Sequence, residues 1–340
     1  MDKILILHPQ GGMGDLILSY PVIQAFYEAY PDRTITYITP PGLENVVKPH
    51  PGVKEVFSLK PGIFSGQNLM KKIQREKIKI ACCLWTTSEI AWLLYLNRIP
   101  IRIGQGDRFP SSSLLTHKVK VRSTQGDTQT HWVEILLDYP RSIGLEPKNK
   151  TIEIQPSQDG MEKAEKLLQE SGVNNQKPIA VIHCGKGENV IHRGWPLDLF
   201  AEVGDELARA GFQVVLTGSA KEIPLVEAVI ARMNLKGYSI AGKTDFQTLA
   251  AVLKKAKIMI CPDSGPMHLA AAVGTPVVAL FAIKKDFPER WKPWGVKSAI
   301  IRPSQFPCSP WCTKENCSDF KCFQILSPKA IVEAALDLAK

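Results

Sequence analysis

Short apolar runs alternate with helix-like patterns along almost the whole chain, and this alternation limits the fold more than any other feature. Seven runs are typical of buried strands, namely 3–8, 34–39, 77–85, 179–184, 212–218, 256–261 and 276–281. Strands that alternate with helices favour parallel sheets with helices on both faces. The pattern starts afresh near Ile179, after the polar, proline-containing segment 144–160. The sequence therefore predicts an α/β protein with two Rossmann-like parallel sheets.

The length of the chain supports two domains, because 340 residues exceed what one hydrophobic core usually organises. We place the first domain at 1–157 and the second at 158–326, and we expect a separate final helix at 327–340. Ser327 is the expected N-cap of that helix. Pro328 then occupies the first helical position, where its missing amide hydrogen costs nothing.

The net charge of +9 favours an anionic partner, such as a phosphosugar, nucleic acid or an anionic membrane face. No zinc-finger or RNA-binding-sheet signature occurs and the basic residues are spread along the chain, so we expect no nucleic acid partner. No uncharged stretch approaches the roughly 18 residues that span a bilayer, and residues 1–7 run into a strand pattern without a signal peptide. We therefore expect a cytoplasmic protein, with contact to the inner membrane surface left open.

The first glycine-rich loop follows the strand run 3–8 and contains Gly11, Gly12, Met13, Gly14 and Asp15. A dinucleotide-binding turn needs a third glycine where this chain has Ile17, and Asp15 would lie against the pyrophosphate. The sequence therefore argues against nicotinamide or flavin binding, and we expect no cofactor.

The second candidate, "GYSIAGKT" at 237–244, satisfies the P-loop pattern. A genuine P-loop follows a buried strand, whereas the residues before this one are polar and the apolar stretch 238–241 lies inside it. We expect 238–241 to form a short strand and a helix to begin near Asp245. An NTPase remains an alternative.

The third candidate, 258–281, is typical of a strand, a loop, a short helix and another strand. Ser264 can cap the helix, Pro266 can open it and Gly274 can end it. The start of a helix at the carboxyl end of a strand favours anions, because its free amides and its dipole point there. We therefore expect a diphosphate at this site.

Other strand ends supply groups that suit the same ligand. Lys186 and Arg193 lie in the loop after the strand 179–184, where their charges would neutralise phosphate oxygens. Glu222 follows the strand 212–218 and could accept hydrogen bonds from ribose hydroxyls. Each of these residues, taken alone, is also compatible with an ordinary surface or helix-start position.

Taken together, the motifs resemble glycosyltransferase family 9, which includes the bacterial lipopolysaccharide heptosyltransferases and has the two-domain GT-B fold. The resemblance covers almost the whole chain in order. It rests on segments 11–26, 192–196, 216–222, 241–257 and, above all, 262–281.

The resemblance implies an inverting transfer of a heptose from a nucleotide-diphosphate sugar, usually ADP-heptose, to a hydroxyl of the lipid A inner core at the inner leaflet. It implies that Asp15 is the general base, that residues 11–14 form the acceptor loop, and that the final helix crosses back to the first domain. It places Arg193, Glu222, Thr244, Asp263, Ser264, Gly265 and His268 at the donor, and we assign Lys186, Thr217 and Gly218 in the loops at neighbouring strand ends to the same site. A carboxylate in the first loop then has a purpose, since it takes a proton from the acceptor hydroxyl.

We expect no metal ion. The sequence contains no D-x-D motif, so a helix start with Lys186 and Arg193 would neutralise the diphosphate instead. Four cysteines near the end, Cys308, Cys312, Cys317 and Cys322, are spaced more widely than typical zinc ligands and are interpreted as a cysteine-rich loop. Segment 282–295 is more basic and slightly longer than is common in the family, which leaves the donor sugar open.

Three alternatives remain beside the transferase. A sugar-nucleotide epimerase of the same fold would release nucleotide without an acceptor, and an NTPase would hydrolyse ATP with magnesium. A sugar-binding protein without catalysis would tolerate loss of Asp15.

Overall fold

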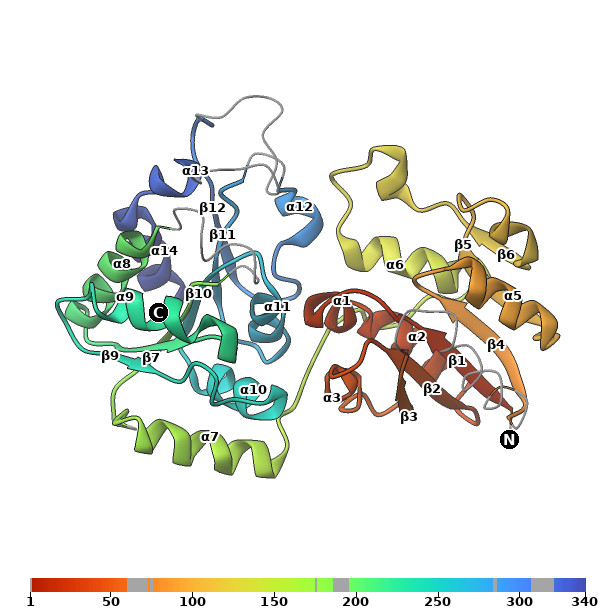
Figure 1. Cartoon of the computed structure of the whole chain (residues 1–340), viewed down its shortest axis with the longest axis horizontal. Coiled ribbons are helices and arrows are strands. Elements are labelled where there is room, and N and C mark those ends of the chain that lie inside the picture. Colours follow the sequence, from red (N-terminus) through yellow and green to blue (C-terminus); the bar gives the residue numbers. More distant parts are fainter. Residues whose placement is uncertain are drawn as a thin grey trace. The chain divides into compact units, whose positions relative to one another are not determined.

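A computed structural model describes residues 2–59, 73, 76–174, 176–185, 196–283, 286–306 and 321–340 (Figure 1). Contacts between Cα atoms divide the chain into two compact units, Met1–Ile152 and Glu153–Lys340. Each unit contains a six-stranded sheet covered by helices. None of the described helices is both long enough and apolar enough to cross a bilayer.

The first unit is built on a parallel sheet with the strand order β3-β2-β1-β4-β5-β6. Its elements are β1 (Lys3–Leu7), α1 (Met13–Leu18), α2 (Tyr20–Ala29), β2 (Thr34–Thr39), α3 (Glu44–Val47), β3 (Val53–Ser58), β4 (Ile78–Cys83), α5 (Ser88–Leu96), β5 (Ile101–Gln105), η1 (Ser111–Leu114), β6 (His117–Val119), η2 (Arg122–Gln125) and α6 (Trp132–Arg141). Leu5 in the central strand β1 pairs with Thr36 of β2 and Ala81 of β4. The chain order reverses between β1 and β4, and ligands of open parallel sheets bind at the carboxyl ends of strands beside such a reversal.

The second unit repeats this arrangement with the strand order β12-β11-β10-β7-β8-β9. Its elements are α7 (Gln158–Glu170), β7 (Ile179–His183), α8 (Leu197–Arg209), β8 (Gln213–Thr217), η3 (Ala220–Glu222), α9 (Ile223–Ile230), β9 (Gly237–Ser239), α10 (Phe246–Lys255), β10 (Ile258–Pro262), α11 (Gly265–Ala272), β11 (Val277–Leu280), α12 (Pro288–Trp291), β12 (Ser298–Ile301), α13 (Lys321–Gln324) and α14 (Pro328–Leu338). Here the reversal lies between β7 and β10, where Val181 pairs with Met259.

All seven apolar runs form strands, and the prediction of two parallel Rossmann-like sheets is confirmed. The sequence did not indicate β3, β5, β6 and β12. These strands are short or carry polar side chains, since β3 exposes Lys54 and β5 contains Arg102, so neither shows the continuous apolar pattern of a central strand.

The segment that matches a P-loop does not have the structure of one. Strand β9 occupies Gly237–Ser239, inside the match, and Asp245 caps α10 by accepting a hydrogen bond from the amide of Thr248 at 2.7 Å. A phosphate-binding loop cannot be the strand itself, so the short strand and helix start are confirmed and the P-loop interpretation is wrong.

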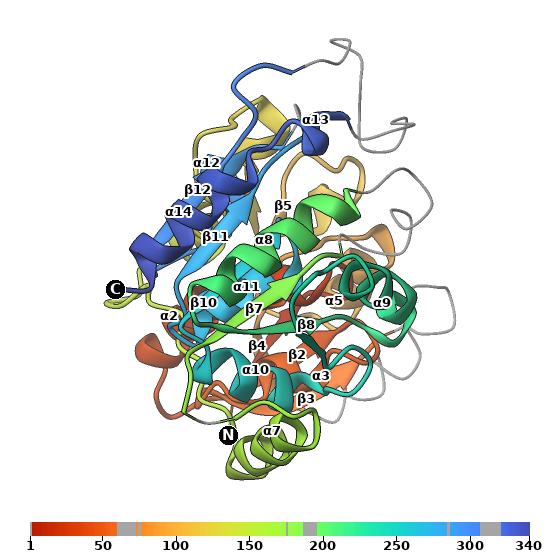
Figure 2. The same ribbon diagram turned by 90° about the vertical axis from the view of Figure 1, so that its left-hand side faces the viewer.

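The last helix packs within the second unit. Figure 2 shows α14 beside α8, and it also contacts β10, β11 and β12. Ser327 caps it by accepting a hydrogen bond from the amide of Ala330, as predicted. Its buried side chains, Ile331, Val332 and Ala335, belong to the hydrophobic core of this unit. The apolar face of the helix is thus buried within its own unit, and its crossing to the first domain stays a prediction.

We expect His50 to make the stability of the first unit dependent on pH. Its ring lies edge-on to Tyr20, with 5.2 Å between ring centroids, and its Nδ1 accepts a hydrogen bond from the amide of Gly52. Burial lowers the pKa of His50 from 6.5 to about 4. Between these two values the unfolded chain binds the proton more tightly, so stability present above pH 6.5 is lost as the pH falls toward 4.

The variant His50→Asn tests this effect. Asparagine keeps an acceptor for Gly52 but does not titrate, so the loss of unfolding free energy between pH 7 and pH 5 should shrink by about 2 kcal/mol relative to the wild type. Urea unfolding at both pH values measures the difference. An equal loss in both proteins would show that His50 is not responsible.

Candidate functional site

The first glycine-rich loop connects β1 to α1 and holds Asp15 at the carboxyl end of β1. The amide of Gly12 donates a hydrogen bond to Oδ2 of Asp15 at 2.8 Å. Gly11 has φ of +99°, and a Cβ atom there would lie 2.9 Å from the same oxygen. Only glycine fits both the backbone conformation and the close approach. The loop sequence therefore determines the position of the carboxylate.

Asp15 is partly a helix-capping residue, as its position in the first turn of α1 allows. Oδ2 is used by Gly12, whereas within the described residues Oδ1 accepts no hydrogen bond. The side chain is half-buried. A carboxylate anchored by one oxygen and open at the other is able to accept a proton from a hydroxyl group.

His8 lies directly after β1 and is a residue of this site that the sequence analysis missed. It is buried, and its Nδ1 is 3.2 Å from the hydroxyl of Tyr37, which is itself 2.8 Å from the hydroxyl of Ser19. Burial lowers the pKa of His8 to about 4, although the nearby Asp15 acts in the opposite direction. The imidazole is therefore neutral at neutral pH. The only sequence signal was a histidine at the end of an apolar run.

In the second unit, Glu222 lies at the carboxyl ends of β7 and β8. Its Oε2 accepts hydrogen bonds from the amide and the hydroxyl of Ser219, at 2.7 and 2.9 Å. A Cβ atom on Gly185 would lie 1.7 Å from Oε1 of Glu222, so that glycine leaves the space which the carboxylate fills. Glu222 is thus a buried carboxylate that packs against Gly185, two residues after the end of β7.

His183, the last residue of β7, lies close to the same carboxylate. Its Nδ1 is 3.2 Å from the carbonyl oxygen of Thr217. Burial lowers the pKa of His183, against the opposing effect of Glu222. The ends of β7 and β8 therefore share a buried, largely satisfied polar cluster.

A backbone hydrogen bond connects the loop after β8 to the loop after β9. The amide of Gly242, which has φ of +72°, donates a hydrogen bond to the carbonyl oxygen of Gly218 at 2.8 Å. Thr244 follows in the same loop and is half-buried. Thr217, Gly218 and Thr244, which the sequence analysis assigned to one ligand, therefore belong to adjoining loops.

Helix α11 begins at the carboxyl end of β10, as predicted. Ser264 occupies the N-cap position, but its hydroxyl makes no capping hydrogen bond, which corrects the expectation that this side chain caps the helix. Among the described residues the hydroxyl is buried without a partner. Asp263 and Gly265 beside it are half-buried, and His268 is buried one turn later. An unused donor at a helix start is an arrangement that suits an anion.

The carboxyl ends of β10, β7, β8 and β9 are neighbours in the second sheet, so the structure brings together most of the predicted donor residues. Lys186 and Arg193 lie outside the described residues. Asp15 and residues 11–14 belong to the first unit.

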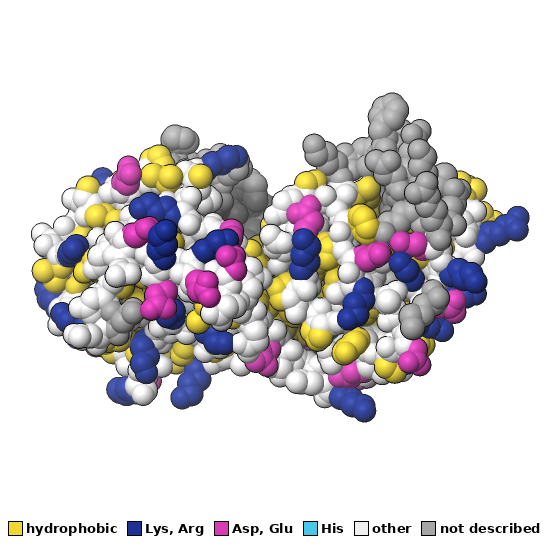
Figure 3. Space-filling model, turned by 90° about the horizontal axis from the view of Figure 1, so that it is seen from below, with side chains coloured by type: hydrophobic (Ala, Val, Ile, Leu, Met, Phe, Trp, Pro, Cys, Tyr) yellow, Lys and Arg dark blue, Asp and Glu magenta, His cyan; other side chains and the backbone are white. Residues whose placement is uncertain are grey.

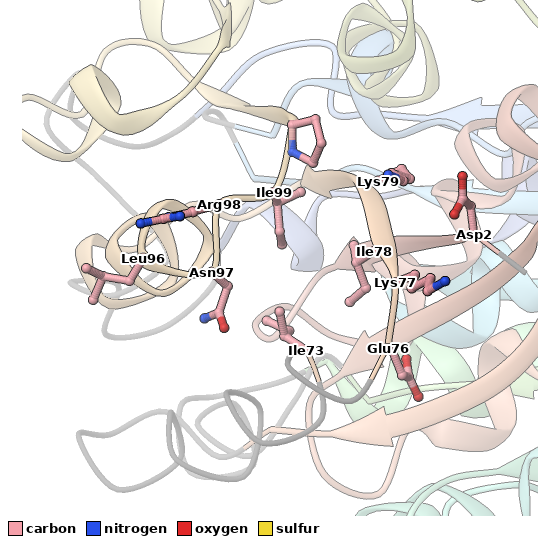
Figure 4. A pocket seen from close by; sticks show the side chains of 11 residues that line it. Asp2, Ile73, Glu76, Lys77, Ile78, Lys79, Leu96, Asn97, Arg98 and Ile99 are labelled. Carbon is pink, nitrogen blue, oxygen red and sulfur yellow. The ribbon is translucent and has the colours of Figure 1, made fainter.

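A cavity of about 670 Å³ lies at the end of the first sheet that is opposite to Asp15. It is lined by residues at the amino ends of β4 and β5, among them Lys77, Lys79 and Ile99 (Figure 4). Asp15 follows the carboxyl end of the neighbouring strand β1, so this cavity is not part of the candidate site.

The cysteines and the surface charge add little to the site. Cys82, Cys83, Cys184 and Cys261 are buried free thiols. Cys322 is also buried, whereas Cys308, Cys312 and Cys317 lie outside the described residues. Within the described part of the chain, no group of three or more His, Cys, Asp or Glu residues could hold a metal ion. On the face shown in Figure 3, basic side chains lie among acidic and uncharged ones.

The chain is similar to known glycosyltransferases in sequence and in structure. The family model "Glycosyltransferase family 9 (heptosyltransferase)" matches residues 67–321. The lipopolysaccharide core heptosyltransferase OpsX of Haemophilus influenzae is 23% identical over 326 residues, which cover 92% of this chain and 90% of that protein.

Two solved structures have the same fold along almost the whole chain. A glycosyltransferase family 9 structure from Veillonella parvula has a TM-score of 0.85 at 21% identity and covers 99% of this chain and 97% of its own. The E. coli ADP-heptose lps heptosyltransferase II has a TM-score of 0.78 at 21% identity, with coverage of 99% and 98%. The two parallel sheets are thus those of the GT-B fold. Since the family match spans most of the sequence, the chain belongs to glycosyltransferase family 9, the heptosyltransferase family, and is a glycosyltransferase.

Proposed function

We propose that this enzyme transfers a heptose from ADP-heptose to a hydroxyl of the lipopolysaccharide inner core with inversion at the anomeric carbon. The observation that carries the proposal is the family match over residues 67–321. The names of two relatives support the choice of acceptor and donor. One is a lipopolysaccharide core heptosyltransferase, and the other is the E. coli ADP-heptose lps heptosyltransferase II. No cofactor takes part.

The donor binds to the second unit in this proposal. The diphosphate lies at the start of α11, where the dipole, the hydroxyl of Ser264 and the neighbouring Asp263, Gly265 and His268 surround it. The nucleoside lies against the adjoining loops that carry Thr217, Gly218, Glu222 and Thr244. Lys186 and Arg193, whose charges suit phosphate oxygens, neutralise the leaving diphosphate.

The acceptor binds beside the loop of residues 11–14, and Asp15 is its general base. As the acceptor oxygen forms a bond to the anomeric carbon, the bond from that carbon to the nucleoside diphosphate breaks and the hydroxyl proton moves to Asp15. The open Oδ1 of Asp15 supports this role, because Oδ2 is held by Gly12. Glycines in the loop let the backbone approach the sugar closely.

A product assay distinguishes this function from a sugar-nucleotide epimerase. The enzyme is incubated with a panel of sugar nucleotides and truncated lipopolysaccharide cores, and the products are weighed by mass spectrometry. We expect one core to gain the mass of one heptose residue while ADP is released. Release of nucleotide without any acceptor would support the epimerase and contradict the proposal.

Transfer should not require a divalent metal. The sequence has no D-x-D motif, and the charge of the diphosphate is met in our proposal by the start of α11 with Lys186 and Arg193. We expect the rate of heptose transfer in excess EDTA to equal the rate with magnesium. A strict requirement for magnesium would show that the charge is neutralised in another way.

The acceptor is a lipid-anchored molecule, so we also propose that the enzyme works at the inner face of the cytoplasmic membrane as a peripheral protein. The positive net charge of +9 supports attraction to anionic lipids.

A further inference from the structure

Helix α5 of the first unit is apolar on both of its faces. Ile90, Ala91, Leu93 and Leu94 are buried, as in any helix that covers a sheet. The opposite face is exposed, yet it consists of Trp92, Tyr95 and Leu96, whose exposed fractions are 52%, 48% and 61%. The outer face of a helix on a protein surface usually carries polar residues. Only Ser88 and Glu89 in the first turn of α5 are polar.

Another exposed aromatic residue lies on the segment that packs against α5. Helix η1 contacts α5, and the loop that leads into η1 carries Phe109, which is 86% exposed. Arg102 links the two elements, because its Nε donates a hydrogen bond to the carbonyl oxygen of Leu114 and its guanidinium lies 5.6 Å from the centroid of the Tyr95 ring. We define the α5 surface as Trp92, Tyr95, Leu96 and Phe109.

Two basic residues, Arg98 and Arg102, lie at one end of this apolar surface. Arg98 lies two positions after the end of α5 and is exposed, and Figure 4 shows its side chain on the same side as that of Leu96, away from Ile78 of β4. Residues 76–121, which form β4, α5, β5 and β6, contain seven Lys and Arg but only three Asp and Glu. An apolar surface with basic residues at one end is complementary to an anionic, amphipathic partner.

We propose that the α5 surface docks the enzyme on an anionic lipid bilayer. Tryptophan and tyrosine prefer the boundary between headgroups and acyl chains, since one part of each ring system is apolar and the other forms hydrogen bonds. Leu96 and Phe109 enter the acyl region, while Arg98 contacts lipid phosphates. This inference rests on the proposed function, because a lipid-anchored acceptor requires the enzyme to work at such a surface.

Flotation with vesicles tests the proposal on the full chain. Vesicles of phosphatidylcholine with phosphatidylglycerol are compared with vesicles of phosphatidylcholine alone, at low and high salt. We expect the wild type to bind the anionic vesicles, less so as salt rises. The double variant Trp92→Glu with Leu96→Glu should bind roughly tenfold or more weakly, because two apolar side chains no longer leave water.

Two further variants make the result specific. Ile325→Glu places the same charge at another exposed apolar position, 51% exposed in the second unit, and should bind like the wild type. Arg98→Asn removes one charge at a residue with φ of +52°, a conformation that asparagine tolerates, and should reduce the salt dependence. Circular dichroism checks that each variant is folded.

The outcomes separate this inference from the proposed function. Heptose transfer to a water-soluble core fragment should be unchanged in the double variant, whereas transfer to a core lipid embedded in vesicles should fall with binding. Vesicle binding equal to that of the wild type would overturn the inference. So would a wild-type dimer that the double variant abolishes without any vesicle binding, because the α5 surface would then join two copies of the chain. Failure of transfer to both acceptors, with vesicle binding intact, would contradict the proposed function alone.

Discussion

Replacement of Asp15 by asparagine should lower turnover by about 10²-fold or more, because the acceptor hydroxyl loses the group that takes its proton in the transition state. Asparagine still accepts the hydrogen bond that the amide of Gly12 donates to Oδ2, so the start of α1 should stay intact. Affinity for ADP should not change, since we assign the diphosphate to the second unit. Calorimetry with ADP and a product assay on the same preparation measure the two effects.

A matched control shows whether the loss of a capping charge alone explains the result. Asp127 in the first unit accepts hydrogen bonds from the amides of Gln129 and Thr130, so Asp127→Asn removes a comparable turn carboxylate. This variant should retain wild-type turnover. The base assignment is wrong if Asp15→Asn abolishes ADP binding, if it leaves turnover intact, or if the control loses as much activity.

Replacement of Gly185 by alanine should have the second largest effect. The added Cβ would lie 1.7 Å from Oε1 and 2.5 Å from Cδ of Glu222. The carboxylate cannot yield easily, because its Oε2 is held by the amide and hydroxyl of Ser219. Overpacking of this kind costs about 1–3 kcal/mol of unfolding free energy. We expect a lower melting temperature together with at least roughly tenfold weaker ADP binding, since the substitution displaces Glu222, which is one of the proposed contacts to the nucleoside.

A second substitution separates the steric effect from the binding effect. In the double variant Gly185→Ala with Glu222→Ala, the clashing atoms are absent, so stability should exceed that of Gly185→Ala alone. Affinity for ADP should remain low, because Glu222 is one of the proposed nucleoside contacts. Additive losses of stability would show that the two residues are not in conflict. Recovery of ADP affinity would remove Glu222 from the donor site.

Most of the fold could be predicted from local patterns. The central strands β1 and β7 are continuous apolar runs because helices cover both faces of a parallel sheet, and a single sequence displays that pattern. The starts of α10 and α14 were likewise predicted correctly, since Asp245 and Ser327 cap amides only three residues further on. The peripheral strands were missed where few side chains are buried, as in β3.

The sequence by itself determined the two parallel sheets, the glycine-rich loop that holds Asp15 and the start of α11, because each depends on neighbours within a few positions. Only the tertiary structure decided that His8 meets Tyr37, which lies 29 positions away, and that Glu222 fills the space left by Gly185. It also placed α14 in the second unit and left the apolar outer face of α5 exposed. The physical reason is that the order of the strands in the sheet determines which loops, distant in sequence, become neighbours. A buried polar group then forms its hydrogen bonds with the residues that this order places beside it.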